Sequence, residues 1–578
     1  GKYAVATVRS QGRPAATVLA EELPGLVAGL RFGKSMRWNS SNVAFSRPIR
    51  WLVAIYGRHV IPFSYAGIHS GDATRGLRFQ QPEEITLKTP EMYFSVLAEQ
   101  GILLDQDQRA ERIREQVETL AQEVEGQAVI EADLLAEVTN LVEAPLGIRG
   151  SFEPGHLELP REVLIAVMKK HQRYFPVEKD GQLLPYFIAI TNRGETERSQ
   201  ELDLITEGNE HVIQARFADA AFFVKEDSRQ SLEDYLPKLG TLMFQKELGS
   251  VLDKTQRIRE LVADIAPRLG LNADNIQIGQ RAAELCKADL VTQMVVEMTS
   301  LQGVMGRYYA LNSGEAQEVA EAIFEHYLPR YAGDAAPGSL PGLVVGLADR
   351  LDSLAGLFAV GLAPSGTKDP FGQRRAALGV VGNLMELNLD FDLREALLAA
   401  AKHLPGDMSP EDLDDCLKFI FERQRNLLLE KGKQFDVIDA VLSVQGHNPN
   451  RAARAVDELS DWVTRQDWTQ VLPTYSRCVR ITRDLEETFS VDESIFEEEA
   501  ETDLYNALLS AEDQERKPGS VDDFLNAFTP LMPEIDKFFD QVLVMVEDER
   551  VRENRLGLLQ RISALANGVV DMSKLEGF

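Results

Sequence analysis

Cysteine, long apolar runs and secretion signals are all scarce or missing in this 578-residue sequence. Its three cysteines, Cys286, Cys416 and Cys478, are far apart and form no CxxC pair, which excludes a zinc ribbon and argues against a disulfide framework. Such cysteine usage fits a reducing, cytoplasmic location. No run approaches the ~20 uninterrupted apolar residues of a membrane helix, and no charged-then-apolar leader is visible. We therefore expect neither membrane insertion nor secretion.

Nucleotide-binding and nucleophile motifs are missing as well. The sequence has no GxxxxGK[ST] loop to hold phosphates and no GxGxxG after a strand. No Ser/His/Asp order and no Cys/His pair stands out. We therefore predict that this chain carries no catalytic residue and binds no cofactor of its own.

Positive charge is in short supply: 61 Lys and Arg stand against 91 Asp and Glu, which gives a net charge of −30. Because phosphate groups bind cationic surfaces, this total argues against a nucleic-acid partner. The charge of the contacting face matters more than the total, however. A nucleic-acid function therefore requires local clusters of basic residues.

The first part of the chain has a mixed character. Short β-rich runs bounded by Gly, Pro or Asn are KYAVATV, IRWLVAIYG, HVIPFSYAGI, APLGIRG and YFIAITN. Between them, residues 90–142 have heptad-like apolar spacing and many Glu and Gln, which predicts a helical insertion. We predict an α+β domain over residues 1–204.

Helical periodicity dominates from residue 205 onward, where β signals nearly vanish. A loop rich in Gly and Pro at residues 332–342 separates two of the expected helices. We predict an all-α domain over residues 205–390 and a second all-α region over residues 391–578. The chain as a whole is then multidomain and mainly α.

One constellation in the middle domain resembles a metal site. Asp289, His326 and Asp349 are expected at the ends of three helices, as in the HD superfamily of metal-dependent phosphohydrolases. Ala288 stands where that family has a His, and two carboxylates with one imidazole fall short of a ligand set. We favour a degenerate, metal-free HD-like scaffold in which Asp289 and Asp349 are caps or salt-bridge partners. The alternative is a phosphohydrolase that acts on nucleotides.

Two segments place basic residues beside features of RNA-binding sites. In the first, Lys169, Lys170 and Arg173 precede Tyr174 and Phe175, a combination that suits a single-stranded RNA end. A turn that buries both rings and leaves the cations in water explains the pattern equally well.

The second segment has two arginines, Arg374 and Arg375, after Asp369 and Pro370, which suit the start of a helix. Paired arginines bind phosphate or neighbouring carboxylates. In so acidic a chain we favour the salt-bridge interpretation, and RNA or a partner chain remains the alternative.

Two basic segments near the C-terminus are further candidates for RNA binding. They contain Arg477, Arg480 and Arg483, and then Arg552, Asn554 and Arg555. The first three recur at every third position and are expected on one side of a helix. The second group precedes an expected buried stripe of leucines, and its Asn554 amide is expected to pair with a base edge. The alternative is that the arginines neutralise neighbouring Asp and Glu.

Ten runs, several of them long and idiosyncratic, occur in order between residues 35 and 380. They include SMRWNSSNVAFSRPIRWLVAI, EGNEHVIQARFADAAFFVKED, LADRLDSLAGLFAVG and KDPFGQRRAALGV. These runs resemble the β subunit of the bacterial, two-subunit glycyl-tRNA synthetase. The resemblance implies an α2β2 enzyme, or an α–β fusion, that joins glycine to tRNA(Gly). It also implies that the α part uses ATP and Mg²⁺ to activate glycine while the β part recognises the tRNA.

The same resemblance implies a domain layout. It consists of a B3/B4-like domain, a degenerate HD domain and a helical DALR-type anticodon-binding domain, in the order predicted above. Chains of this family carry a further N-terminal segment, so we expect that this sequence, which begins at Gly1, is truncated. A non-enzymatic RNA-binding protein is a further alternative to the synthetase subunit.

Overall fold

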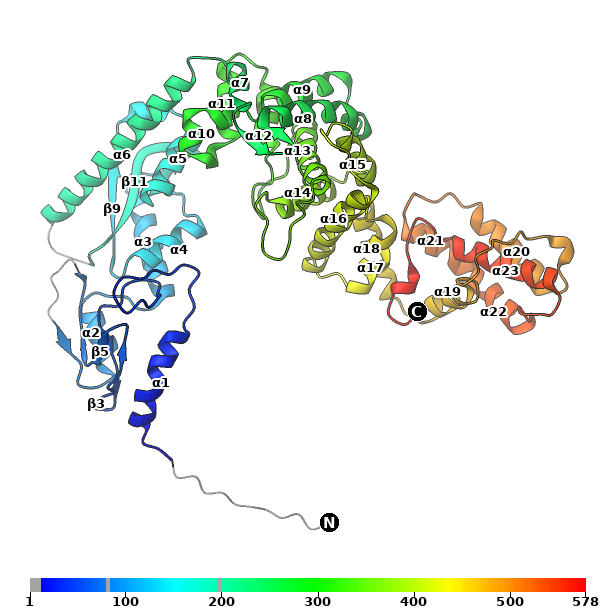
Figure 1. Ribbon diagram of the computed structural model, residues 1–578, viewed down its shortest axis with the longest axis horizontal. Helices are drawn as coiled ribbons and strands as arrows, with labels where there is room; N and C mark the ends of the chain where they lie inside the picture. Colours follow the sequence, from blue (N-terminus) through cyan, green and yellow to red (C-terminus); the bar gives the residue numbers. More distant parts are fainter. Residues whose placement is uncertain (1–11, 79–83, 195–198) are drawn as a thin grey trace, which may run out of the picture. The chain divides into compact units, whose positions relative to one another are not determined.

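The computed structural model describes residues 12–78, 84–194 and 199–578, and the strand expected in KYAVATV lies outside these residues. The chain divides into two compact units, Gly1–Val224 and Lys225–Phe578. Helices predominate along the chain (Figure 1), as the sequence predicts. No helix in the described part of the chain is long and apolar enough to cross a bilayer.

The first unit opens with an exposed helix and very short strands. Helix α1 (Ala15–Gly29) buries none of its residues. The strands are β1 (Leu52–Val53), β2 (Ile55–Tyr56), β3 (His59–Val60), β4 (Ser64–Tyr65), β5 (Ile68–Gly71), β6 (Ala73–Thr74) and β7 (Ile85–Thr86). Strand β5 pairs in parallel with β1 and antiparallel with β4, while β2–β3 and β6–β7 form separate pairs. The β structure predicted in IRWLVAIYG and HVIPFSYAGI is confirmed.

A four-stranded antiparallel sheet forms the centre of the first unit. Its order is β8 (Gln127–Ala128), β10 (Phe175–Lys179), β11 (Gln182–Asn192) and β9 (Pro145–Ser151). Strand β11 pairs with β9 along seven positions, from Tyr186 opposite Ser151 to Asn192 opposite Pro145. The strands predicted in APLGIRG and YFIAITN are therefore confirmed.

Helices cover this sheet and close the unit. Those in residues 90–142 are α2 (Met92–Glu99), α3 (Gln106–Gln122) and α4 (Ala132–Leu141). The apolar stripe of α3, Ile113, Val117 and Ala121, packs into one core with Phe175 and Ile188 of the sheet. Helices α3 and α4 are thus part of the sheet's core, whereas Leu97 of α2 lies in a separate cluster with Leu77 and Ala144. Helix α5 (Arg161–Ala166) continues into a π-helical turn (Val167–Gln172), and α6 (Ser199–Asp227) reaches the second unit.

The first half of the second unit is built around one buried helix. Its helices are α7 (Leu236–Leu239), α8 (Val251–Ile265), α9 (Ala273–Leu285), α10 (Gln293–Glu297), α11 (Val304–Asn312), α12 (Gln317–Glu325), α13 (Leu340–Ala359), α14 (Gln373–Glu386), α15 (Leu393–Ala401) and α16 (Pro410–Glu430). Helix α13 is apolar on nearly every side and packs against α8, α9, α12, α14, α15 and α16.

One hairpin departs from the all-α prediction for this region. Strands β12 (Met243–Gln245) and β13 (Gly249–Ser250) pair antiparallel. The Gln245 side chain accepts hydrogen bonds from the backbone N–H groups of Glu247 and Leu248, and Gly249 adopts a φ of +85°. The leucines on either side keep helical spacing, which hides this turn in the sequence.

The second half of the unit is an all-α bundle, as predicted. It contains α17 (Phe435–Gln445), α18 (Pro449–Val463), α19 (Trp468–Thr482), α20 (Glu499–Glu512), α21 (Val521–Phe528), α22 (Met532–Gln541) and α23 (Glu549–Ala564). Helix α19 packs against α23. The predicted buried stripe is confirmed: Leu556, Leu558, Leu559, Ile562 and Leu565 all lie in the core with the rings of α21 and α22.

Candidate functional site

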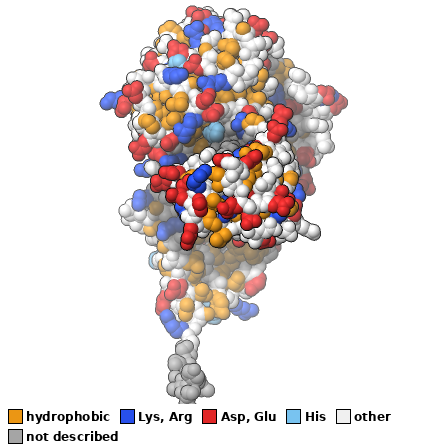
Figure 2. Space-filling model, turned by 90° about the vertical axis from the view of Figure 1, so that its right-hand side faces the viewer, with side chains coloured by type: hydrophobic (Ala, Val, Ile, Leu, Met, Phe, Trp, Pro, Cys, Tyr) orange, Lys and Arg blue, Asp and Glu red, His pale blue; other side chains and the backbone are white. Residues whose placement is uncertain are grey.

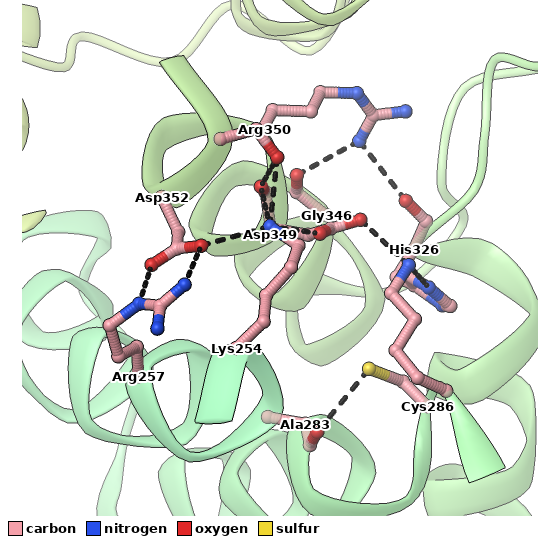
Figure 3. A network of polar contacts seen from close by, with 11 residues as sticks. Lys254, Arg257, Ala283, Cys286, His326, Gly346, Asp349, Arg350 and Asp352 are labelled. Carbon is pink, nitrogen blue, oxygen red and sulfur yellow. Dashed lines mark hydrogen bonds and ion pairs between the residues drawn. The ribbon is translucent and has the colours of Figure 1, made fainter. Parts of the chain in front are cut away.

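Six ionisable side chains form a largely buried cluster, the charged centre, on α8, α12, α13 and the turn after α9 (Figure 3). They are Lys254, Arg257, Lys287, His326, Asp349 and Asp352. Asp349 lies in the middle of α13, not at a helix end as predicted, 2.9 Å from Lys254 Nζ and 2.8 Å from Lys287 Nζ. Burial would raise the pKa of Asp349, but the two ammonium groups outweigh it and hold the pKa well below its usual range.

Asp352 supplies the second carboxylate of the charged centre. Arg257 donates to its two oxygens from Nε at 2.6 Å and from Nη2 at 3.2 Å, and Lys254 Nζ lies 2.9 Å away. A buried charge is tolerated only when it is paired and hydrogen-bonded. These contacts therefore fasten α8 to α13.

His326 is the neutral member of the charged centre. Its Nδ1 lies 2.6 Å from the carbonyl oxygen of Ile323, and its Nε2 lies 2.9 Å from Lys287 Nζ. Burial and the neighbouring Lys287 charge lower the pKa of His326 well below its usual value. The ring therefore donates a hydrogen bond from Nδ1 to the carbonyl and accepts one at Nε2 from the Lys287 ammonium group.

Asp289 faces a different set of groups. Its Oδ2 accepts hydrogen bonds from the backbone N–H groups of Gly303 (2.6 Å) and Gly306 (3.0 Å) at the start of α11. Burial raises the pKa of Asp289 to about 6 in spite of these bonds. Asp289 is thus a cap and Asp349 a salt-bridge partner, as the sequence predicts. In the described ranges of the chain, no three His, Cys, Asp or Glu side chains are arranged to hold a metal.

The two lysines of the charged centre were missed by the sequence analysis. Lys287 lies between Asp349 and His326, where a metal ion would have to bridge them. A signal for Lys254 was available, because it shares the apolar stripe of α8 with Val251 and Ile258. A lysine on a buried stripe indicates a buried carboxylate on another element.

The first basic segment lies in the π-helical turn of the first unit. Lys169 forms an ion pair with Glu131, and Arg173 Nε donates to Glu137 at 2.9 Å. Lys170 is exposed and has no ion pair with a described residue. The base-stacking interpretation of the two rings is wrong. Tyr174 and Phe175 are buried, and Tyr174 stacks on Phe187 in the core with ring centroids 4.5 Å apart.

The second basic segment begins α14, as predicted. The Asp369 carboxylate accepts hydrogen bonds from the backbone N–H groups of Gln373 and Arg374, each at 2.9 Å. The Arg374 guanidinium donates to the carbonyl oxygen of Gly366. Arg375 is exposed, and within the described chain neither arginine has a carboxylate partner. The salt-bridge interpretation favoured from the sequence is therefore wrong for this pair.

Three arginines lie on the exposed side of α19 and just beyond its end. Arg477 forms an ion pair with Asp536 at 3.2 Å and lies over the Phe539 ring. Arg480 lies over the Phe578 ring, 5.7 Å from its centroid. Arg483 has only a loose contact with Asp484, at 3.7 Å. All three guanidinium groups remain open to solvent.

The candidates on α23 are mostly internal. Asn554 is 2% exposed, and its amide accepts from the backbone N–H of Asp492 at 2.7 Å and donates to the carbonyl of the same residue at 3.1 Å. Arg555 is 4% exposed and binds Glu501 at 2.9 Å and Glu497 at 3.1 Å. Neither side chain can reach RNA in this fold, so the prediction that Asn554 and Arg555 bind RNA is wrong. Arg552 is half-buried and donates to the carbonyl of Val546.

Charges of both signs are interspersed on the face of the molecule shown in Figure 2. Lys and Arg side chains alternate there with Asp, Glu and apolar groups, without one broad basic area. An RNA partner on such a face must be held by a few well-placed cations.

Comparison with known proteins identifies the family to which this chain is similar. Residues 1–443 match the family model described as glycyl-tRNA synthetase beta subunit, and residues 471–571 match the DALR anticodon binding domain. The glycine–tRNA ligase beta subunit of Moorella thermoacetica is 42% identical over 100% of this chain, which covers 84% of that protein. The beta subunit of Clostridioides difficile is 40% identical over 99% of this chain and 83% of its own length. The chain also matches 54% of the chloroplastic/mitochondrial glycine–tRNA ligase 2 of Arabidopsis thaliana, at 40% identity.

Proposed function

This chain belongs to the glycyl-tRNA synthetase β-subunit family, and we propose that it recognises tRNA(Gly) for a partner α subunit that attaches the glycine. The observation that carries this function is about 40% identity to glycine–tRNA ligase beta subunits along essentially the whole chain. The match of residues 471–571 to an anticodon-binding domain supports the tRNA-reading role.

We propose that the two chains divide the work. The α subunit forms glycyl-adenylate from glycine and ATP, with Mg²⁺ as cofactor and with release of pyrophosphate, in an α2β2 assembly or an α–β fusion, and this chain binds neither ATP nor Mg²⁺. The absence of a phosphate-binding motif in the sequence supports this division. The three cysteines are free and buried, which fits the reducing cytoplasm as the proposed location.

We further propose that residues 1–204 form a B3/B4-like domain, residues 205–390 a catalytically silent HD-like domain, and residues 391–578 a helical linker with the anticodon-binding domain. The charged centre supports the proposal that the middle domain is not catalytic, because the Lys287 ammonium group occupies the place between Asp349 and His326. The phosphohydrolase alternative needs a metal at that place.

The candidates for tRNA or α-subunit contact are the cations with open guanidinium or ammonium groups. These are Lys170, Arg173, Arg375, Arg477, Arg480 and Arg483. Lys169, Arg374 and Arg552 are half-buried as well as engaged with protein groups, and are weaker candidates.

The function is tested by charging tRNA(Gly) with glycine in the presence and absence of the α subunit. We expect no charging by this chain alone, no glycine-dependent ATP–pyrophosphate exchange by it, and full charging when α is added. Exchange by the pure chain would contradict the division of labour. Failure of the complex to charge tRNA(Gly) would contradict the function itself.

A further inference from the structure

Residues 31–78, here called the basic segment, carry a charge opposite in sign to that of the whole chain. The segment has eight Lys and Arg and a single acidic residue, Asp72, which gives a net charge of +7 in a chain whose total is −30. It follows α1 and contains strands β1–β6 of the first unit (Figure 1). We propose that the basic segment binds an unpaired stretch of RNA; binding to tRNA(Gly) in particular rests on the proposed function.

The cations of the basic segment are open to solvent and almost unused by the fold. All eight side chains are exposed: Arg31, Lys34, Arg37, Arg47, Arg50, Arg58, Arg75 and Arg78. Within the described chain only Arg75 has an ion pair, at 2.5 Å from the exposed Glu84. Asp72, the one acidic residue of the segment, is half-buried. Like charges that the fold leaves without partners attract a polyanion.

The loop that begins the basic segment is held in place by backbone and side-chain contacts. Met36 and Phe45 exchange backbone hydrogen bonds of 2.8 and 3.1 Å. Asn39 Nδ2 donates to the carbonyl oxygen of Ala66 at 2.8 Å, and the Phe45 ring contacts that of Tyr65 with centroids 6.5 Å apart. These contacts fasten the loop to the β4–β5 hairpin, so its arginines are presented from an ordered scaffold.

Exposed aromatic rings lie among these cations. Trp51 directly follows Arg50, is 44% exposed, and has the Arg75 guanidinium 5.9 Å from its ring centroid. Tyr56 on β2 is 54% exposed. Unpaired bases stack on such rings and on guanidinium planes, whereas the bases of a duplex are already stacked on one another. The rings therefore favour single-stranded RNA over a duplex, and over an acidic peptide, which has no bases.

Trp51 also lines a cavity of about 450 Å³. Ile55 of β2, Thr74 of β6 and Tyr93 of α2 are further lining residues, and none of the described residues that line it is acidic. The Tyr93 hydroxyl has no hydrogen-bond partner in the described ranges of the chain. Apolar walls can cover the faces of a nucleobase while a hydroxyl pairs with its edge as donor or acceptor. The cavity thus offers one base a place beside the stacking ring.

The charge is tested by the binding of a labelled single-stranded RNA of about ten nucleotides to the assembled α–β enzyme. The variant Arg47→Ala/Arg50→Ala should weaken binding about tenfold. It should also lower the slope of log K against log salt concentration by about 1.4, at ~0.7 per phosphate contact. The control Lys418→Ala/Lys431→Ala removes the same charge from α16 and the residue directly after it, and should change neither quantity.

The stacking ring is tested with the same RNA. Trp51→Ala should weaken binding about tenfold, because one base loses its ring, and Trp51→Phe should stay within about threefold of wild type. Phe435→Ala removes an exposed ring at the start of α17 and should have no effect. A duplex of the same sequence should bind without any dependence on Trp51.

Two further substrates identify the source of the RNA: tRNA(Gly), and tRNA(Gly) that lacks its unpaired 3′ end. A loss of affinity in the basic-segment variants that disappears with the shortened tRNA assigns the segment to the 3′ end. An equal loss with both tRNAs assigns it to another unpaired stretch of the tRNA. A loss seen with the oligonucleotide alone assigns it to a different RNA.

Two results would overturn the proposal. One is a wild-type complex that does not bind the oligonucleotide, or binding that stays unchanged in basic-segment variants shown to be folded by thermal unfolding. The other is impaired assembly of these variants with the α subunit, measured by gel filtration, while the complexes that do form bind the RNA normally; the segment would then dock protein. A wild-type complex that cannot charge tRNA(Gly) would remove the proposed function and leave the oligonucleotide result standing.

Discussion

At the scale of single residues, the charged centre shows how buried polar groups on different helices are paired by a cation. Lys287 Nζ lies 2.8 Å from Asp349 Oδ2 and 2.9 Å from His326 Nε2. Its ammonium group thereby binds one carboxylate and one imidazole from two different helices. A side chain held in this way contributes to stability and offers no open position for substrate.

Replacing this lysine should therefore destabilise the fold. In Lys287→Met, the Asp349 carboxylate keeps only its ion pair with Lys254, and the Nε2 atom of His326 loses its hydrogen-bond donor. We expect the free energy of unfolding to fall by about 3 kcal/mol, measured by urea denaturation. Lys170→Met is the matched control and should change it by less than about 0.5 kcal/mol. Equal stability of the two variants would show that the centre does not depend on Lys287.

Asp289 should make the stability of the folded chain depend on pH. Burial raises its pKa to about 6 from 3.8, so between these values the folded chain keeps a proton that the unfolded chain has lost. The stability from this group is complete below about pH 4 and is lost as the pH rises through about 6. Asp289→Asn, which cannot ionise, should gain stability relative to wild type between pH 4.5 and pH 7, by about 3 kcal/mol at most. Urea denaturation of both proteins at several pH values measures the difference, and a constant difference would exclude this titration.

At the scale of elements, α23 explains why some predictions succeeded and others failed. Its leucine stripe was predictable, because apolar residues at helical spacing face a core. Arg555 lies on that same stripe, four residues after the buried Val551, and should have been placed inside on this ground. Its partner Glu501 lies on α20, more than fifty residues earlier, and local spacing carries no information about such a pair. The hairpin β12–β13 was missed for a related reason, since its turn depends on the Gln245 side chain.

The two arginine groups of the C-terminal bundle should therefore respond differently to mutation. Arg555→Ala leaves Glu501, which is 1% exposed, without its guanidinium partner and should lower stability by about 3 kcal/mol. Charging of tRNA should then fall only as far as folding does. Arg480→Ala should change stability by less than about 0.5 kcal/mol and weaken tRNA binding. Thermal unfolding and a tRNA-binding titration distinguish the two, and loss of binding without loss of stability in Arg555→Ala would contradict the assignment.

At the scale of the whole molecule, the sequence predicted a mainly helical chain with its β structure in the first part, because strand and helix periodicities differ. The family was also accessible, since long ordered runs are shared along the chain. The exposure of the candidate tRNA-binding residues could not be predicted, because it depends on which helix face is covered. Lys170 and Arg375 are open, whereas Asn554, chosen by the same reasoning, is internal.

A chain with a net charge of −30 repels RNA at long range, so binding must come from local contacts. Replacing Arg477, Arg480 and Arg483 with Ala changes the net charge by the same amount as replacing Arg394, Lys418 and Lys431 with Ala. The last three side chains are exposed on α15, on α16 and directly after α16. If total charge governed tRNA binding, both triple variants would weaken it equally. If α19 contacts the anticodon loop, only the first triple should lose affinity. The slope of log K against log salt concentration should then fall by about 2, at ~0.7 per single-stranded phosphate contact. Filter-binding of tRNA(Gly) to the α–β complex between 50 and 300 mM salt (roughly the range where such slopes are linear) measures this, and parallel slopes for both variants would place the RNA contacts away from α19.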